Sequence, residues 1–549
     1  MSILVFFSLI FLRLSCSHFL VAFDHSAISG ITSTLDGLHL CKKWLRSCVD
    51  SHELCSSITD QNQMPTRLLA IGGSSLQLHD MAGTSTPVQY ATLSHCWGGK
   101  EFLKLLRDNL DSFHLSIPHD ELQKTFQDAI FIARYLGFEY LWIDSLCIIQ
   151  DDKDDWERES TLMIDVYGGS ALNIAAVSAE NGSVGCFFLR QPRCLVQLPS
   201  TRTGANIVPT EVKPYPDGHN HRTPLFKRGW VLQERHLPRR TLYLYEKEIS
   251  WSCRETSCCE SGSRVHGIFR TEMIARDKWT DTVERYSSMA LTEASDRLVA
   301  IGGLAKVIQE QTGDGYIAGI WRQDLDLQLL WFAYDSKRVD EIYRAPTWSW
   351  ASIGQPVRFL GRLEGGSEPQ RYTQVSDVAI DYTSSSSFGQ VCGGYIRLRC
   401  KYFGPCMIKY EPNAIFNKLV YGNCQFTGKL YFDIIGWEDS ASNVLSQNVD
   451  ERREEKSSEK EIPSENQRLR EVVPGQKSLY MLPILPDEGL FLEAIDGARR
   501  QYRRVGMYWL LKPEEGFVSS LEASTPAIID HTELSTGEDG ETSYLIEII

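Results

Sequence analysis

Between residues 90 and 177 the apolar residues alternate between compact runs and runs with helical spacing. Residues 90–94, 140–144 and 171–177 are short apolar runs, which are typical of strands buried on both faces. Between these runs the spacing predicts one helix that ends near Gly137 and a second that follows the acidic residues 151–155. The pattern therefore predicts an α/β fold in which three neighbouring strands form a parallel sheet flanked by helices.

Further along, the pattern predicts a short helix at about 230–237 and a hairpin in TLYLYEKEISW, so that the α/β core closes near residue 260. Residues 280–335 have helical spacing, whereas 370–435 carry short alternating runs typical of strands. Residues 438–477 contain almost no large apolar residues, and we predict that they are disordered. The predicted division is a partly helical leader at 1–64, a domain at 65–352 with its α/β core at about 88–260, and a β-rich region at 353–549.

Composition and charge disfavour nucleic-acid binding, secretion and membrane insertion as functions or locations of this chain. The 549 residues carry a net charge of -15, which disfavours a nucleic-acid partner because phosphate backbones would be repelled. The 15 cysteines are irregularly spaced in a chain with ample apolar residues, so we expect reduced thiols and a cytoplasmic location. The apolar residues 1–23 lack a basic start, and Arg13 interrupts them. We therefore expect a buried helix or a mis-assigned gene start, and no stable membrane span, with a secretory signal or membrane anchor as the lesser alternative.

Three sequence blocks carry a family resemblance. They are YATLSHCWGG at 90–99, which PTRLLAIG at 65–72 precedes, YLWIDSLCIIQDDKDDWERESTLMIDVYGGSALNIAA from residue 140, and RGWVLQERHLPRRTLYLYEKEISWSC at 228–253. In order and type they resemble the fungal heterokaryon-incompatibility (HET) domain family over about residues 65–352. The resemblance implies an intracellular signalling or effector module of non-self recognition and regulated cell death, which acts through a protein partner or self-association. The chain departs from the family at His95, where tyrosine is usual, and at Ile149, where aspartate is common.

Several polar residues follow the predicted strands. Ser94, Cys96, Trp97 and Gly98 lie at or just after the end of the first strand, and Asp144 ends the second. Open α/β sheets bind ligands at the carboxyl ends of their strands, so these residues are candidate ligand-binding groups. Backbone N–H groups near Gly98 would be available to oxyanions. The alternative is that Trp97 belongs to the core and that Asp144 only caps a helix or loop.

HET domains are in turn considered similar to the Toll/interleukin-1 receptor (TIR) fold, some members of which cleave NAD with a glutamate that follows a tryptophan on a helix. The segment GWVLQE resembles that arrangement. By this resemblance Glu234 would be catalytic, stabilising the charge on the ribose as nicotinamide leaves, and Trp230 would support the pocket. NAD would be a substrate, and no cofactor is expected. The alternative is that Glu234 pairs on the surface with Arg235, Arg239 or Arg240.

The cysteines suggest little further chemistry. Cys48, His52 and Cys55 form a C-x3-H-x2-C pattern that lacks a fourth ligand and the paired spacing of convincing zinc sites, so we predict no metal site. Further ligands would come from Cys253, Cys258 and Cys259 only if the fold brought them close. We interpret Cys96 and Cys147 as small buried hydrophobic residues rather than nucleophiles.

Overall fold

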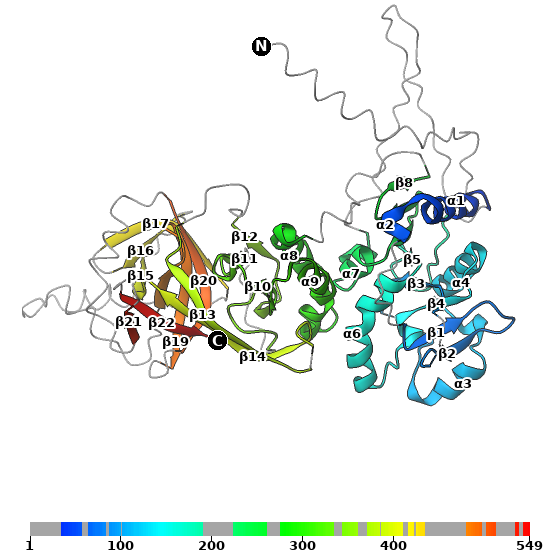
Figure 1. Ribbon diagram of the computed structural model, residues 1–549, viewed down its shortest axis with the longest axis horizontal. Coiled ribbons are helices and arrows are strands. Elements are labelled where there is room, and N and C mark those ends of the chain that lie inside the picture. The colour runs from blue at the N-terminus through cyan, green and yellow to red at the C-terminus, as the bar shows by residue number, and fades with distance from the viewer. Residues whose placement is uncertain are drawn as a thin grey trace, which may run out of the picture.

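The computed structural model describes residues 35–56, 64–83, 87–99, 101–189, 223–260, 275–333, 343–360, 370–384, 386–409, 416–421, 424–433, 479–496, 501–511, 533–536 and 542–549. An α/β region, a mainly helical middle region and a β-rich region follow one another along the long axis of the molecule (Figure 1). The apolar run at 1–23 and the predicted disordered segment at 438–477 lie outside the described residues.

The α/β region is built on an eight-stranded sheet with the order β2-β1-β4-β3-β5-β6-β7-β8. The four central strands β4, β3, β5 and β6 are parallel to one another, which confirms that the three predicted strands lie side by side. The strands are β1 (Arg67–Ala70), β2 (Gln77–Asp80), β3 (Tyr90–Ser94), β4 (Tyr140–Trp142), β5 (Leu172–Ala175), β6 (Arg240–Leu244), β7 (Ile249–Cys253) and β8 (Ser257–Cys259). The hairpin predicted in TLYLYEKEISW is confirmed by the antiparallel pair β6 and β7. The antiparallel strands β1, β2 and β8 were not predicted, and with β7 they make the sheet mixed.

Helices cover this sheet much as the spacing predicts. They are α1 (Leu35–Ser51), α2 (Glu53–Ser56), α3 (Leu110–Leu115), α4 (Lys124–Leu136), α5 (Asp144–Cys147), α6 (Lys153–Gly169) and α7 (Val231–His236). Helix α4 buries Phe126 and Ile130 and ends at Gly137, whose φ of 96° is accessible to glycine at little cost. Helix α6 begins at Asp152, whose carboxylate accepts hydrogen bonds of 3.1 Å from the N–H groups of Asp154 and Asp155.

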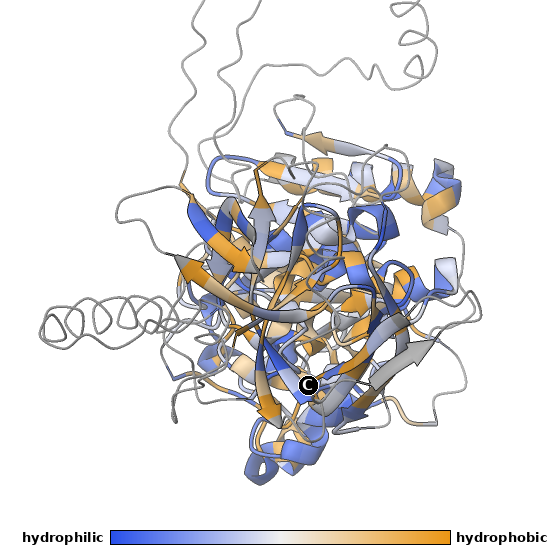
Figure 2. Cartoon of the chain, turned by 90° about the vertical axis from the view of Figure 1, so that its left-hand side faces the viewer, coloured by the Kyte–Doolittle hydropathy of each residue, from blue (hydrophilic) through white to orange (hydrophobic). Residues whose placement is uncertain are grey.

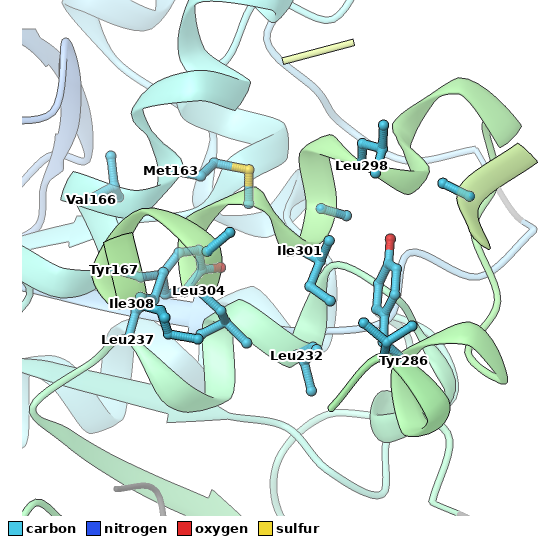
Figure 3. Packing of buried hydrophobic residues seen from close by; sticks show 14 of the residues in the cluster. Met163, Val166, Tyr167, Leu232, Leu237, Tyr286, Leu298, Ile301, Leu304 and Ile308 are labelled. Atoms are coloured by element: carbon cyan, nitrogen blue, oxygen red, sulfur yellow. The ribbon is translucent and has the colours of Figure 1, made fainter. Parts of the chain in front are cut away.

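The middle region packs against α6 and α7. Its elements are α8 (Trp279–Ser287), α9 (Val299–Thr312), α10 (Leu325–Gln328), β9 (Tyr316–Ile317), β10 (Ile320–Trp321), β11 (Trp331–Ala333) and β12 (Val357–Phe359). Figure 3 shows buried apolar side chains from α6, α7 and α9 gathered in one layer, including Met163, Leu237 and Leu304. In the part of the chain that the structure describes, no helix combines the length and apolar character needed to cross a membrane.

The β-rich region confirms the predicted strand pattern at 370–435. Its sheet contains β13 (Thr373–Tyr382), β14 (Val391–Cys400), β15 (Gly404–Lys409), β16 (Asn417–Tyr421), β17 (Cys424–Phe432), β18 (Leu479–Pro483), β19 (Glu488–Asp496), β20 (Gln501–Leu510), β21 (Glu533–Thr536) and β22 (Thr542–Ile548). Strands β20, β17, β16, β15, β18 and β19 close into a ring, because β19 also pairs with β20. Hydrophobic and hydrophilic segments alternate along these strands (Figure 2). Buried Arg504 pairs with Asp433 at 3.0 Å and donates to the carbonyl of Trp331, which ties the ring to the middle region.

Candidate functional site

Polar side chains meet at the carboxyl edge of the parallel strands. Ser94, the last residue of β3, donates a hydrogen bond of 3.2 Å to Oδ1 of Asn173 in β5. Nδ2 of Asn173 in turn donates to the carbonyl of Glu234 at 3.1 Å. The two strands and α7 are therefore fixed to one another by a buried amide.

Glu234 lies inside the protein and is only 6% exposed. Burial raises the pKa of its carboxyl group to about 7, while the positive charge of Arg228 and hydrogen bonding with Ser94 and Tyr167 oppose that rise. The proposed surface pairing with Arg235, Arg239 or Arg240 is therefore wrong for this residue, because a buried carboxyl cannot act as a solvated surface charge. A carboxyl group whose pKa is raised toward neutrality suits acid–base or electrostatic work.

Asp144 and Trp97 meet beside this group. Asp144 accepts hydrogen bonds from Nε1 of Trp97 at 2.8 Å and from the N–H of Ser145 at 2.7 Å, and its carboxylate lies 3.7 Å from Nδ1 of His95. Asp144 is the first residue of α5 and does not cap it, because Ile143 is the N-cap; its side chain instead holds the loop after β3 through Trp97. The aspartate contributes to the ordering of this edge whatever further role it has.

His95 packs its ring edge-on against Phe126 at 4.9 Å between ring centres. Burial lowers the pKa of His95 to about 4, so the ring is neutral at physiological pH. Its Nε2 has no hydrogen-bond partner among the described residues. The side chain that departs from the family pattern therefore lies at the site itself.

Two further predicted site residues make contacts outside the polar group: Cys96, although it also lies beside Arg228, and Trp230. Cys96 belongs to an apolar cluster with Phe226 and Tyr243, and burial raises the pKa of its thiol to about 11. The indole of Trp230 donates to Asp296 at 3.2 Å and stacks edge-on with Trp156, which directs its polar group toward the middle region. His95 and Cys96 do not form a pair, as expected for adjacent strand residues.

The loop after β3 makes a close backbone approach at Gly98. Its φ is 68°, and a Cβ added there would lie 2.3 Å from the Cβ of Asn181. Only glycine fits this position without moving the neighbouring loop. The predicted binding of an oxyanion by backbone N–H groups at this loop stays a prediction.

Sequence reasoning missed Tyr167, Asn173 and Arg228, although all three lie within the quoted sequence blocks. The available signal was an asparagine inside an otherwise apolar strand, because a buried amide needs partners nearby. Arg228 donates to the carbonyl of His95 and brings a positive charge to the site, but no local pattern revealed which strand it would reach.

A second buried cluster lies at the opposite, amino edge of the parallel strands. One ligand atom each from Cys48, His52, Cys55 and Cys253 lies within 4.8 Å of all the others. The condition stated for a fourth ligand is therefore met by Cys253, because the fold brings the end of β7 to α1 and α2. Cys258 is half-buried, and its thiol has a pKa raised to about 12 by burial.

Comparison with known proteins gives one family match, and it covers the parallel strands β3, β4 and β5 and the helices between them. Residues 90–234 match the family described as heterokaryon incompatibility protein (HET). The matched segment begins with β3, contains β4, β5, α4 and α6, and ends at Glu234. No curated protein and no solved structure shows significant similarity to the chain. The chain therefore carries a heterokaryon incompatibility (HET) domain at residues 90–234.

Proposed function

We propose that this chain is a cytoplasmic signalling or effector module of fungal non-self recognition, which promotes regulated cell death when a protein partner or self-association clusters its HET domain. The observation that carries the proposal is the family match at residues 90–234, which coincides with the parallel strands and their covering helices. Clustering requires a folded, rigid domain rather than a reaction, and the buried polar contacts at the carboxyl edge supply such rigidity. The net charge of -15 favours protein over nucleic-acid partners.

The test is inducible expression of the full chain in a filamentous fungus, with and without a fused domain that dimerises on addition of a small molecule. We expect viability to fall on induction and to fall further on dimerisation. The control is Leu93→Asp, which places a charge in the buried central strand β3 and should abolish the effect at matched expression. Normal growth with the clustered wild-type chain would contradict the proposal.

A second candidate is an NAD glycohydrolase, as the similarity to TIR folds implies. The observation that favours it is the buried carboxyl of Glu234, which lies among Ser94, Tyr167 and Arg228 and has a pKa near 7. In that reaction the bond between the ribose and nicotinamide breaks, nicotinamide leaves with the electron pair, and water adds to the ribose carbon and loses a proton. The charged carboxylate would stabilise the positive charge that develops on the ribose.

Purified chain, incubated with NAD under clustering conditions and analysed for free nicotinamide, tests this candidate. If Glu234 is catalytic, Glu234→Gln lowers the rate by about 100-fold or more. The matched control is Glu157→Gln on the exposed face of α6, which should leave the rate unchanged. The rate should rise with pH through about 7 as Glu234 ionises. Cell death that persists in the Glu234→Gln chain would support the clustering module without the enzyme.

A further inference from the structure

The cluster at the amino edge joins two distant parts of the chain. Cys48 lies on α1, His52 connects α1 to α2, Cys55 lies on α2, and Cys253 ends β7. The Sγ of Cys253 lies 3.3 Å from Nδ1 of His52, across 201 residues of sequence. The three cysteines are almost fully buried and His52 is half-buried, so the group is shielded from solvent on most sides.

These distances suit a tetrahedral metal ion. With zinc–sulfur and zinc–nitrogen bonds of about 2.3 and 2.0 Å, tetrahedral ligands lie roughly 3.5–3.8 Å apart. The four ligand atoms lie within 4.8 Å of one another before any ion draws them in, so small side-chain rotations complete the geometry. Three sulfurs and one imidazole nitrogen are a ligand set that selects zinc over calcium or magnesium.

The surroundings of the sulfurs are those of thiolates. Nε of the buried Arg240 donates to Sγ of Cys48 at 3.1 Å, and its Nη2 donates to the carbonyl of Cys55 at 3.1 Å. No carboxylate pairs with Arg240 within the described part of the chain, although a buried guanidinium needs an anion. The backbone N–H of Thr256 also donates to Sγ of Cys253 at 3.4 Å. Hydrogen bonds of this kind support metal-bound sulfur.

Simple burial of cysteine as a small apolar residue explains these contacts less well. Cys41, on the same helix α1, is also buried but does not belong to the cluster of potential ligands. Apolar burial would not direct an imidazole nitrogen and a guanidinium toward sulfur atoms. Three thiolates, a neutral imidazole and a divalent ion carry one net negative charge, which Arg240 neutralises.

We propose that Cys48, His52, Cys55 and Cys253 bind one structural zinc ion, which fastens α1 and α2 to the end of β7. Four protein ligands leave no open position, so the ion stabilises the fold and does not activate water. A neighbouring contact also joins α2 to the residues after β7, because Glu255 accepts a hydrogen bond of 2.7 Å from the N–H of Leu54. The ion would thus anchor α1 and α2, which precede the HET domain in sequence, to the eight-stranded sheet.

Metal analysis of the full chain, purified under reducing conditions without added metal, tests the site. We expect about one zinc ion per chain in the wild type and loss of that zinc in Cys253→Ser and in Cys48→Ser. Two matched controls should keep it: Cys258→Ser, next to the cluster on β8, and Cys392→Ser, an exposed cysteine of the β-rich region. Wild-type chain that neither contains zinc nor takes it up would overturn the proposal, as would a disulfide between any two of the three cysteines.

Cobalt substitution keeps the test decisive if the serine variants fail to fold. Cobalt-loaded wild type should show the visible absorption of a tetrahedral site and charge-transfer bands from three thiolates. The variant His52→Cys should keep the metal and show stronger charge transfer, because a fourth thiolate replaces the imidazole. Absorption typical of octahedral cobalt, or no change in His52→Cys, would refute the ligand set.

Discussion

The two edges of the eight-stranded sheet bury different chemistry. At the carboxyl edge, hydroxyl, carboxyl and guanidinium groups surround Glu234, whose pKa of about 7 leaves its protonation sensitive to small changes in its surroundings. At the amino edge, three sulfurs and an imidazole face one another as a complete ligand set. A group that changes charge near neutral pH suits a reaction or a response, whereas a saturated ligand set suits stability. The comparison teaches that one sheet can keep responsive and stabilising groups apart by placing them at opposite strand ends.

The largest expected effect is loss of the metal from the amino edge. A membrane-permeant zinc chelator should lower the unfolding temperature of the wild-type chain by about 10 °C or more, because metal binding contributes directly to folding. Scanning calorimetry measures the change, and readdition of zinc should reverse it. The Cys253→Ser chain should unfold at the lower temperature from the start and not respond to the chelator. If the chelator lowered the unfolding temperature equally in both chains, the amino edge would not hold a stabilising metal.

The carboxyl edge also contains a buried ion pair between Arg67 and Asp155, at 2.5 Å. Arg67→Met should cost about 3–5 kcal/mol of unfolding free energy, because Asp155 would keep only the exposed Arg158 as an ionic partner, and Glu159 and the carbonyl of Cys147 would also lose Arg67. Lys153→Met, which removes an exposed pair with Glu157 on α6, should cost no more than about 0.5 kcal/mol. Urea unfolding of the two variants measures the loss of unfolding free energy in each. Similar losses in both variants would show that burial does not govern these pairs.

Glu234 should give the carboxyl edge a pH dependence of its own. The folded pKa of about 7 lies above the ordinary value of 4.5, so between these values the folded state holds a proton that the unfolded state has lost. Stability should therefore fall as pH rises from about 4.5 to 7, by roughly 3 kcal/mol through this group, and level off above that range. Urea unfolding of the wild type and Glu234→Gln across this range measures the difference, which should vanish in the variant. Glu157→Gln should follow the wild type.

The smallest effect concerns the loop after β3. Gly98→Ala should cost roughly 2 kcal/mol more than Gly83→Ala, because both glycines have positive φ but only Gly98 faces a close neighbour. The reference glycine has φ of 81° and nothing within 4 Å of an added Cβ. Chemical denaturation measures the unfolding free energy of both variants. Equal losses would mean that the loop around Asn181 moves to make room for the added Cβ at little cost.

The sequence allowed the centre of the sheet to be predicted because its signals are local. The apolar runs predicted at 90–94, 140–144 and 171–177 contain three adjacent strands, although β4 and β5 are shorter than predicted, and Gly137 ended α4 as expected. The strands β1 and β2 were missed because each has four residues and depends on pairing for its identity. The antiparallel pairing of β6 with β7 was predictable as a hairpin, whereas the antiparallel pairing at the β1 and β2 side was not readable from the apolar runs alone.

The candidate site was predicted in part for the same physical reason. Ser94 and Asp144 end or follow strands, where topology gathers them without knowledge of side-chain direction. Glu234, inside α7, was singled out only by the resemblance of GWVLQE to TIR folds. The direction of Trp230 toward Asp296 and the arrival of Arg228 at His95 depend on tertiary packing. The fourth potential ligand, Cys253, was the hardest to assign because no spacing rule relates it to the C-x3-H-x2-C segment.

The separation of 201 residues between His52 and Cys253 also sets the order of events during synthesis. At about 5–20 residues per second, α1 and α2 leave the ribosome roughly 10–40 s before β7 follows them. Through that interval Cys48 and Cys55 lack Cys253, and α1 lacks its contact with β7. During synthesis the segment of Cys48 and Cys55 is thus complete before the hairpin of β6 and β7 that it packs against.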